Sequence, residues 1–330
     1  MHFRVILRIL GILMMLFSFS MLPPVAVSMI YADGTSLPFL IAFGITLVTG
    51  FITWLPVHNV RQDLRTRDGF LITVLFWVVL SLFGSIPLML SATPHLSIVD
   101  AVFESVSGLT TTGATVITGI DLLPQSILWY RQQLQWFGGM GIIVLAVAIL
   151  PMLGIGGMQL YRAETPGPVK DSKLTPRITE TAKALWYIYL SLTILCALGY
   201  WLAGMTPFDA ICHSFSTVAI GGFSTHDASM GYFDNPMIEA IAIFFMVISA
   251  VNFALHFSAW KHRSLRHYWE DPELRFYLSI LLVISFFCTI VLELTGTFTG
   301  VVALRHAVFE VVSIATTTGF ATADFAHWPT

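Results

Sequence analysis

The sequence predicts an all-α polytopic membrane protein made of repeated units, and three observations indicate this fold class. Hydrophobic residues make up 56% of the 330 residues and charged residues only 11%, whereas a soluble domain carries about 25% charged residues. Several apolar runs reach the length of about 20 residues that crosses a bilayer as a helix. A short segment that contains glycine also recurs three times along the chain.

Hydropathy predicts seven full spans, and the first is too long for the apolar core of a signal peptide. Three further apolar pieces, at 100–112, 209–221 and 306–318, have only about 13 residues each and cannot cross a hydrocarbon core of about 30 Å. We expect them to be re-entrant half-helices, which a membrane tolerates where protein or a water-filled cavity shields the broken backbone. The full spans are expected near residues 5–30, 37–57, 70–91, 126–152, 181–203, 235–260 and 274–296.

Basic residues predict the orientation of these spans. If the N-terminus is cytoplasmic and the three short pieces leave on the side they entered, 14 of the 16 Lys and Arg residues fall inside. Only Arg131 and Arg305 then fall outside. This asymmetry agrees with the positive-inside rule and independently favours re-entrance.

The recurring segment defines an internal repeat. AVFESVSGLTTTGA begins at Ala101, AICHSFSTVAIGGF at Ala210 and AVFEVVSIATTTGF at Ala307. The first and third copies agree at ten of thirteen positions up to the glycine, and the middle copy keeps its alanine, one serine and the glycine. We call the three residues that end at the aligned glycine the first (Thr111–Gly113), second (Ile220–Gly222) and third (Thr317–Gly319) glycine loops. The unit is therefore span, half-helix, glycine loop and span.

This unit has the chemistry of a cation path. Asp100 and Asp209 are expected to cap the half-helices at their N-termini. The C-terminus of each half-helix, which carries about half a negative charge, would then point at a glycine loop and favour a cation. Potassium-channel filters use rings of backbone carbonyls from such loops to replace the hydration shell of the ion. The predicted potassium ligands are mainly the carbonyls of Thr111, Thr112, Gly113, Ile220, Gly221, Gly222, Thr317, Thr318 and Gly319.

Several residues allow two interpretations. Glu104 and Glu310, with His213 in the same place of the second copy, could belong to a structural network or attract cations to an outer mouth. The glycines at 138, 139 and 141 could form a hinge or allow close packing. Gly11 and Gly44 are expected to pack helices together.

Two other classes of function compete with a pore. An alternating-access symporter, carrying potassium with protons or sodium, would show inverted repeats, but the successive units here run in parallel. An enzyme would need paired titratable groups inside the spans, and the spans offer almost none. Cys196, Cys212 and Cys288 have neither disulfide nor metal spacing. We therefore expect no enzyme, no bound cofactor and no nucleic-acid partner.

The stretch RQQLQWFGGMGIIVLAVAILPMLGIGGMQLYRAETPGP at 131–168, with TTTGATV and AIGGFSTHDAS, resembles the Trk/Ktr/HKT superfamily of cation transporters, specifically its TrkH family of bacterial potassium-uptake membrane subunits. The resemblance implies one pore from four units in a single chain, preceded by two extra helices. It implies potassium selectivity from Gly113, a multi-pass homodimer in the bacterial cytoplasmic (inner) membrane, and gating by a cytoplasmic TrkA-type RCK nucleotide-binding subunit. That subunit would dock on the basic segments at 162–183 and 261–275, which could equally be ordinary positive-inside loops.

The resemblance also divides the chain. Residues 1–69 hold the two extra helices and a cytoplasmic loop, 70–180 the first pore repeat and 181–273 the second. Residues 274–330 hold an incomplete third repeat, and the fourth repeat, which in the family carries the last filter loop, is absent. We expect the chain to be a fragment, or another chain to complete the ring.

Overall fold

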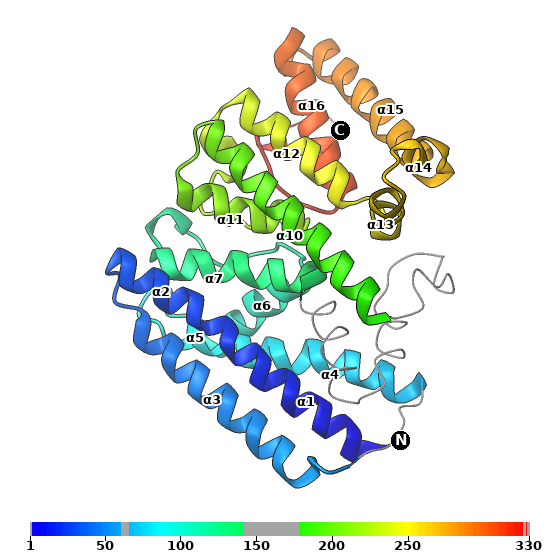
Figure 1. Cartoon of the computed structure of the whole chain (residues 1–330). Helices are drawn as coiled ribbons and strands as arrows, with labels where there is room; N and C mark the ends of the chain where they lie inside the picture. The colour runs from blue at the N-terminus through cyan, green and yellow to red at the C-terminus, as the bar shows by residue number, and fades with distance from the viewer. Residues whose placement is uncertain (1, 61–65, 142–177, 326–327, 329–330) are drawn as a thin grey trace. The chain divides into compact units, whose positions relative to one another are not determined.

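A computed structural model describes residues 2–60, 66–141, 178–325 and 328, and every regular element in these ranges is a helix (Figure 1). The chain divides into two compact units. The first unit contains 1–110 and 114–186, and the second contains 111–113 and 187–330. The first glycine loop thus belongs with the second unit, although the residues on either side of it belong with the first.

In the first unit, prolines mark where helices begin. Pro23 and Pro24 stand in the first turn of α2 and Pro87 in that of α5, where the missing N–H has no helical partner to lose. Three-residue 3₁₀ turns at 19–21, 55–57 and 120–122 accompany the helices. The helices are α1 (Phe3–Ser18), α2 (Leu22–Tyr31), α3 (Ser36–Trp54), α4 (Thr66–Gly84), α5 (Ile86–Leu90), α6 (Ile98–Leu109) and α7 (Gln125–Trp136), followed by a π-helical turn (Phe137–Gly141).

The second unit continues from α10 (Ile178–Leu202), whose first residues belong to the first unit. A 3₁₀ turn at Ser229–Phe233 follows the second glycine loop. Helix α16 packs against both α12 and α15. The helices after α10 are α11 (Pro207–Val218), α12 (Pro236–Ser249), α13 (Phe253–His262), α14 (Arg266–Glu270), α15 (Pro272–Leu294) and α16 (Gly300–Ala315).

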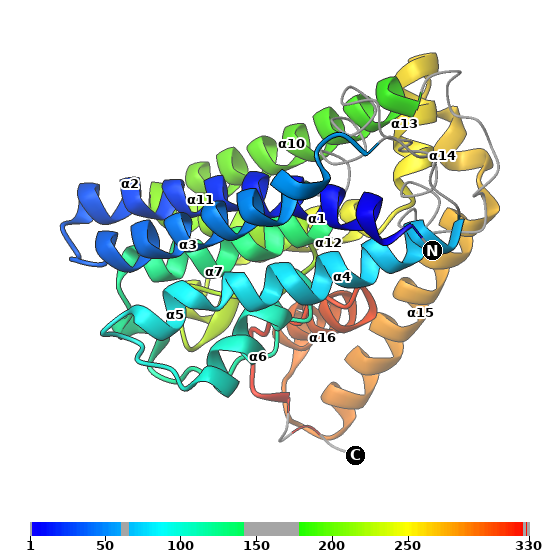
Figure 2. The ribbon, with the colours of Figure 1, turned by 90° about the horizontal axis from the view of Figure 1, so that it is seen from below.

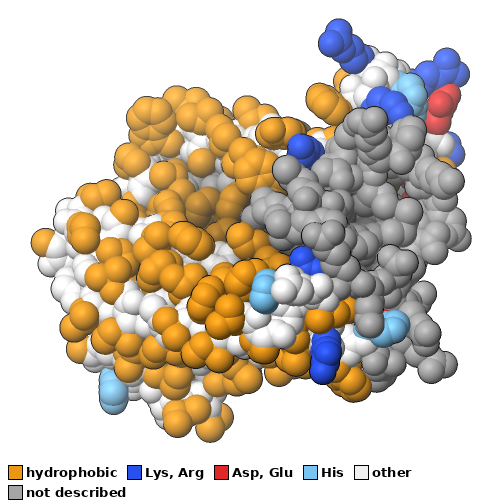
Figure 3. All heavy atoms as spheres, turned by 60° about the horizontal axis from the view of Figure 1, so that its bottom comes forward, with side chains coloured by type: hydrophobic (Ala, Val, Ile, Leu, Met, Phe, Trp, Pro, Cys, Tyr) orange, Lys and Arg blue, Asp and Glu red, His pale blue; other side chains and the backbone are white. Residues whose placement is uncertain are grey.

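Five predicted spans are confirmed as continuous apolar helical segments long enough to cross a membrane, at Phe3–Tyr31, Ser36–Val57, Asp68–Leu90, Lys183–Leu202 and Pro272–Leu294. Burial differs among them: the first span is 61% buried, whereas α15 exposes large apolar side chains such as Phe276 and Phe286, at 69% and 67%. Hydrophobic side chains are spread widely over the described part of the face seen in Figure 3. The surface is therefore suited to lipid rather than water.

The span expected at 235–260 is apolar and helical over its length, but it is broken. The structure has α12 and α13 here, bent by 90° at the break between them. The reason is a local cap, since the Asn252 side chain accepts a hydrogen bond from the Ala254 amide at 3.0 Å and starts a new helix. Hydropathy cannot detect such a cap inside an apolar run. In the span expected at 126–152, α7 and its π-helical turn form the first part, and residues 142–152 lie outside the described residues.

The three half-helices are confirmed as short elements. Helices α6 and α11 have 12 residues each and α16 has 16, so they rise about 18 Å and about 24 Å, less than a hydrocarbon core of about 30 Å. The predicted capping residues are wrong. Ser97 and Thr206 are the N-caps, and their side chains accept from the amides of Asp100 and Asp209.

In return, the hydroxyls of Ser97 and Thr206 donate to these aspartates at 2.7 Å. This reciprocal arrangement is a form of capping box, in which an acid three residues after the cap supports it. The spacing is visible in the sequence and would have identified the correct caps.

Helices α1 and α3 lie side by side (Figures 1 and 2), and glycines allow their close approach. A Cβ on Gly11 would lie 2.7 Å from the Gly50 carbonyl oxygen, and a Cβ on Gly50 would lie 2.9 Å from that of Gly11. The packing role expected for Gly11 is confirmed. The one expected for Gly44 is wrong, because a Cβ there would meet no described atom within 4 Å.

Gly11→Val should separate α1 from α3 and lower stability by roughly 1–3 kcal/mol, the usual cost of overpacking. The matched control is Gly44→Val, which adds the same side chain to α3 where there is open space. The thermal midpoints of the two purified variants in detergent measure the difference. Equal midpoints would show that the α1–α3 contact does not depend on Gly11.

Candidate functional site

The three glycine loops are neighbours in the second unit. A Cβ on Gly113 would lie 2.1 Å from the Gly221 carbonyl oxygen, and a Cβ on Gly222 would lie 1.9 Å from that of Thr318. No real Cβ approaches so closely, so only glycine permits these backbone contacts. A Cβ on Gly319 would meet no described atom within 4 Å. The loops therefore follow one another in chain order, and the far side of the third is open within the described residues.

The loops also share one backbone conformation. Each glycine is left-handed, with φ of +76° at Gly113, +81° at Gly222 and +84° at Gly319. The residue two positions earlier in each loop is left-handed as well, with φ of +53°, +49° and +64° at Thr111, Ile220 and Thr317. Left-handed β-branched residues are rare and strained, and strain of this kind concentrates at functional sites. The common feature of TTTG and AIGG is therefore their backbone rather than their side chains.

Each loop directly follows the C-terminal end of a half-helix. Helix α6 ends at Leu109, α11 at Val218 and α16 at Ala315. Backbone bonds at 2.8 Å hold the later loops to these ends, from Gly221 N to Ser216 O and from Thr318 N to Ser313 O. The unpaired carbonyls of a helix C-terminus make this end electronegative. The local electrostatics therefore favour a cation at the loops.

Glu104 lies inside a hydrogen-bond network of the first unit. Its carboxylate accepts from Arg131 Nε at 2.8 Å, from Thr115 Oγ1 at 3.0 Å and from Val116 N at 3.2 Å. The side chains of Glu104 and Arg131 are both 0% exposed. Glu104 thus joins α6, the chain that leaves the loop, and α7. This geometry favours the structural interpretation over attraction of ions to an open mouth.

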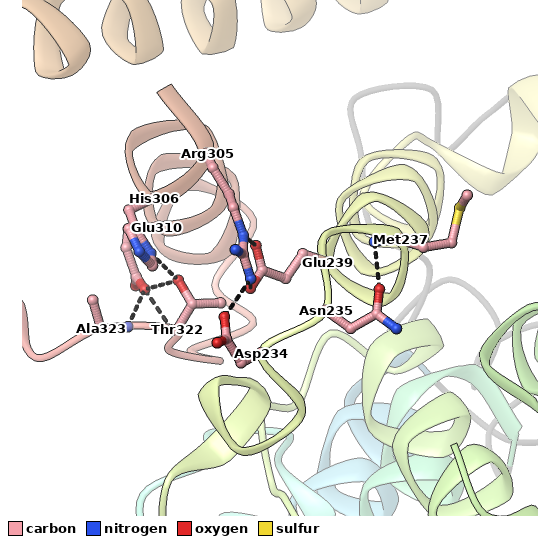
Figure 4. A network of polar contacts seen from close by, with 9 residues as sticks. All are labelled: Asp234, Asn235, Met237, Glu239, Arg305, His306, Glu310, Thr322 and Ala323. Carbon is pink, nitrogen blue, oxygen red and sulfur yellow. Dashed lines mark hydrogen bonds and ion pairs between the residues drawn. The ribbon is translucent and has the colours of Figure 1, made fainter. Parts of the chain in front are cut away.

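Glu310 holds the chain after the third glycine loop in the same way (Figure 4). Its Oε1 atom accepts from Thr322 N at 2.7 Å, from Thr322 Oγ1 at 3.1 Å and from Ala323 N at 3.3 Å. In the second copy, His213 Nε2 lies 2.9 Å from Ser224 Oγ. Glu104, His213 and Glu310 therefore share one structural role. Each binds the chain segment that leaves its glycine loop.

Arg131 and Arg305, the two basic residues that the positive-inside rule places outside, each bind a buried carboxylate. The sequence analysis did not identify these partners. Arg131 pairs with Glu104 in the first unit. In the second, Arg305 contacts the two oxygens of Glu239 at 2.6 Å and Asp234 at 2.9 Å (Figure 4). An isolated arginine in an apolar setting is itself a signal that a partner exists, although it does not identify the partner.

Gly138, in the π-helical turn after α7, packs closely in the first unit. A Cβ there would lie 1.9 Å from the carbonyl oxygen of Leu109, the last residue of α6. This contact supports the close-packing interpretation of Gly138. Of the two basic segments, 162–177 lies outside the described residues, whereas 261–275 comprises the ends of α13 and α15 and the whole of α14 between them.

Comparison with known proteins places this geometry in a family context. The model of the cation transport protein family TrkH matches residues 36–330. The chain is 64% identical over 329 residues to the Trk system potassium uptake protein TrkH of Halomonas elongata and 55% identical over 330 residues to that of Escherichia coli K12. In each case all of this chain is covered and 68% of the relative.

A solved structure agrees with these relatives. The crystal structure of the potassium transporter TrkH from Vibrio parahaemolyticus superimposes with a TM-score of 0.88 at 55% sequence identity. The match covers 100% of this chain and 68% of that one. The helical arrangement described above is therefore that of a known membrane transporter.

Arg131→Gln should destabilise the protein by about 3–5 kcal/mol, because it leaves the buried Glu104 carboxylate without its charge partner. The matched control is Arg266→Gln, which removes an ion pair with Glu270 of 2.5 Å whose side chains are 80% and 59% exposed and costs at most about 1 kcal/mol. Thermal midpoints in detergent measure both.

The double variant Arg131→Met with Glu104→Leu should recover part of the loss, since it leaves no unpaired charge. A midpoint for Arg131→Gln no lower than that of Arg266→Gln would contradict the assignment.

Proposed function

The chain belongs to the TrkH cation transport protein family, and on this premise we propose that it takes up potassium through a selective pore walled by its glycine loops. The observation that carries the proposal is the direct backbone contact between consecutive loops, Gly113 to Gly221 and Gly222 to Thr318. The relatives are named potassium uptake proteins, and their names identify potassium as the ion. Potassium is thus the transported substrate.

In this pore, backbone carbonyls replace the water around the ion. The left-handed conformation of two residues in each loop sets the direction of these carbonyls, and close packing of one loop on the next holds it. The C-termini of α6, α11 and α16 add a negative potential at the same place. The ligands proposed are the carbonyls of Thr111, Thr112, Gly113, Ile220, Gly221, Gly222, Thr317, Thr318 and Gly319. The open side of Gly319 is where a fourth wall, from further sequence or another chain, would stand.

The chain is a multi-pass membrane protein by its apolar helices and family. We place it in the bacterial cytoplasmic (inner) membrane with a cytoplasmic N-terminus, because the positive-inside rule favours that orientation. The resemblance to the family and the asymmetry of the basic residues support this placement together. The four-part division into extra helices and pore repeats belongs to the same proposal.

Uptake of rubidium by potassium-deficient cells that express the full-length protein tests the function. We expect uptake that saturates with rubidium and that excess potassium suppresses. A protein that is folded in the membrane but takes up no rubidium would contradict a potassium-conducting pore.

Gly113→Ser should lower the permeability ratio of potassium to sodium by about tenfold or more, because any Cβ at 113 meets the Gly221 carbonyl and displaces a proposed ligand. The matched control is Gly119→Ser. Gly119 is also left-handed, at φ +71°, but a Cβ there would meet only a leucine methyl carbon at 3.9 Å. Reversal potentials in mixed-ion gradients measure the ratio. Equal ratios in the two variants would remove Gly113 from the filter.

We further propose a homodimer and a TrkA-type nucleotide-binding partner that gates the pore from the cytoplasmic side. The Trk-system names of the relatives and the basic residues of 261–275 support this partner. Charge reversal at Lys261 and Arg263 should abolish co-purification of a TrkA-type subunit while rubidium uptake by the transporter itself persists. Co-purification that survives the reversal would exclude this docking surface.

A further inference from the structure

One polar residue is identical in all three repeats and has no role in the site as described so far. It is a serine six positions before each glycine, namely Ser107, Ser216 and Ser313. The threonines of the loops are replaced in the second copy, and the glutamate is replaced by histidine, but this serine is kept. All three serines are buried, at 4%, 0% and 0% exposure. Their burial and repetition require a physical reason.

The structure supplies a shared hydrogen bond. Ser107 Oγ donates to the carbonyl oxygen of Ala114 at 2.5 Å, and Ser313 Oγ donates to that of Phe320 at 2.6 Å. Both acceptors belong to the residue that immediately follows the loop glycine. The serine therefore reaches seven residues forward, out of its helix, to the peptide group where the chain leaves the loop.

This bond differs from the usual behaviour of a hydroxyl in a helix. Helical serines and threonines commonly bond to a carbonyl one turn back, as Thr110 does with Val106 O and Thr217 with His213 O on the same half-helices, both at 2.7 Å. Such bonds remain within the helix. The bonds of Ser107 and Ser313 instead fix the direction of one carbonyl outside it.

That direction matters in a filter built of backbone carbonyls. The number and field strength of the carbonyls that face the ion govern discrimination between potassium and sodium. A carbonyl turned toward a buried hydroxyl points back at its half-helix and is satisfied there. The run of proposed ligand carbonyls then ends at the loop glycine.

We propose that Ser107 and Ser313, with Ser216 in the equivalent place, are positioning residues that set where the ligand run of each glycine loop ends. The inference rests on the proposed function of the loops as a potassium filter. It assigns to the serines an effect on selectivity in addition to their contribution to folding.

The test uses the full-length protein in liposomes, with the potassium-to-sodium permeability ratio taken from reversal potentials. Ser107→Ala and Ser313→Ala should each lower this ratio about fivefold to tenfold, the equivalent of one net hydrogen bond. Ser107→Thr, which keeps a hydroxyl, should retain most of the wild-type ratio.

Ser105→Ala is the matched control. Ser105 lies on the same half-helix and is also 0% exposed, but its hydroxyl has no hydrogen-bond partner among the described residues. The control should keep the wild-type ratio. It removes the same atom from α6 without touching the chain that leaves the loop.

The outcomes separate this inference from the function on which it rests. Unchanged ratios in both alanine variants, with a selective wild type, would overturn the role of the serines and leave the pore intact. Loss of folding in both alanine variants, with Ser105→Ala folded, would reduce the serines to structural residues and also overturn it. A wild type that does not prefer potassium would instead overturn the proposed function.

Discussion

Backbone polar groups that cannot reach water must find partners inside the protein, and the irregular parts of this chain are organised by that constraint. An unsatisfied backbone group in a bilayer costs several kcal/mol. Each glycine loop breaks a helix, so each exposes such groups. The aligned residues Glu104, His213 and Glu310 bind the chain that leaves a loop, and Ser107 and Ser313 bind its first carbonyl after the first and third loops. The short run of loop carbonyls between these bound segments is the part that we propose faces a cation.

The arginines in the apolar parts of the protein are also paired, in this case with carboxylates. Arg131 with Glu104 joins α7 to the half-helix α6, and Arg305 with Glu239 joins the half-helix α16 to α12. Removing two charges from water is costly, so such pairs are weak sources of stability, but breaking one is expensive because a buried charge is left alone. In this protein, the ion pairs fix the relative positions of the elements that they join. The carboxylate of Glu104 binds both the arginine and the chain after the first loop, so it fixes that chain relative to α7.

Contacts between the loops explain why glycine recurs where threonine does not. At Gly113 and Gly222 the backbone of the next loop occupies the space that a Cβ would fill. At Thr111, Ile220 and Thr317 the loop instead has a strained left-handed residue that carries a side chain. Strain persists only where surrounding structure enforces it. Hydrogen bonds from the second and third loops to their half-helices, and the contacts between neighbouring loops, supply that enforcement.

The sequence by itself determined the class, five of the spans, the shortness of the half-helices and the alignment of the three glycines. These depend on hydropathy, length and repetition, which are properties of the chain read in one dimension. Only the tertiary structure decided the 90° break after α12, the true caps of the half-helices and the partners of the two arginines. The caps were in principle readable from spacing.

The ion pairs were not, because they join residues 27 and 66 positions apart. Which carboxylate an arginine meets depends on how helices cross, and that is settled by close packing at positions such as Gly11 and Gly138. The same holds for the loops. Repetition in the sequence identified three equivalent glycines, and only folding brought the backbone of one against the next.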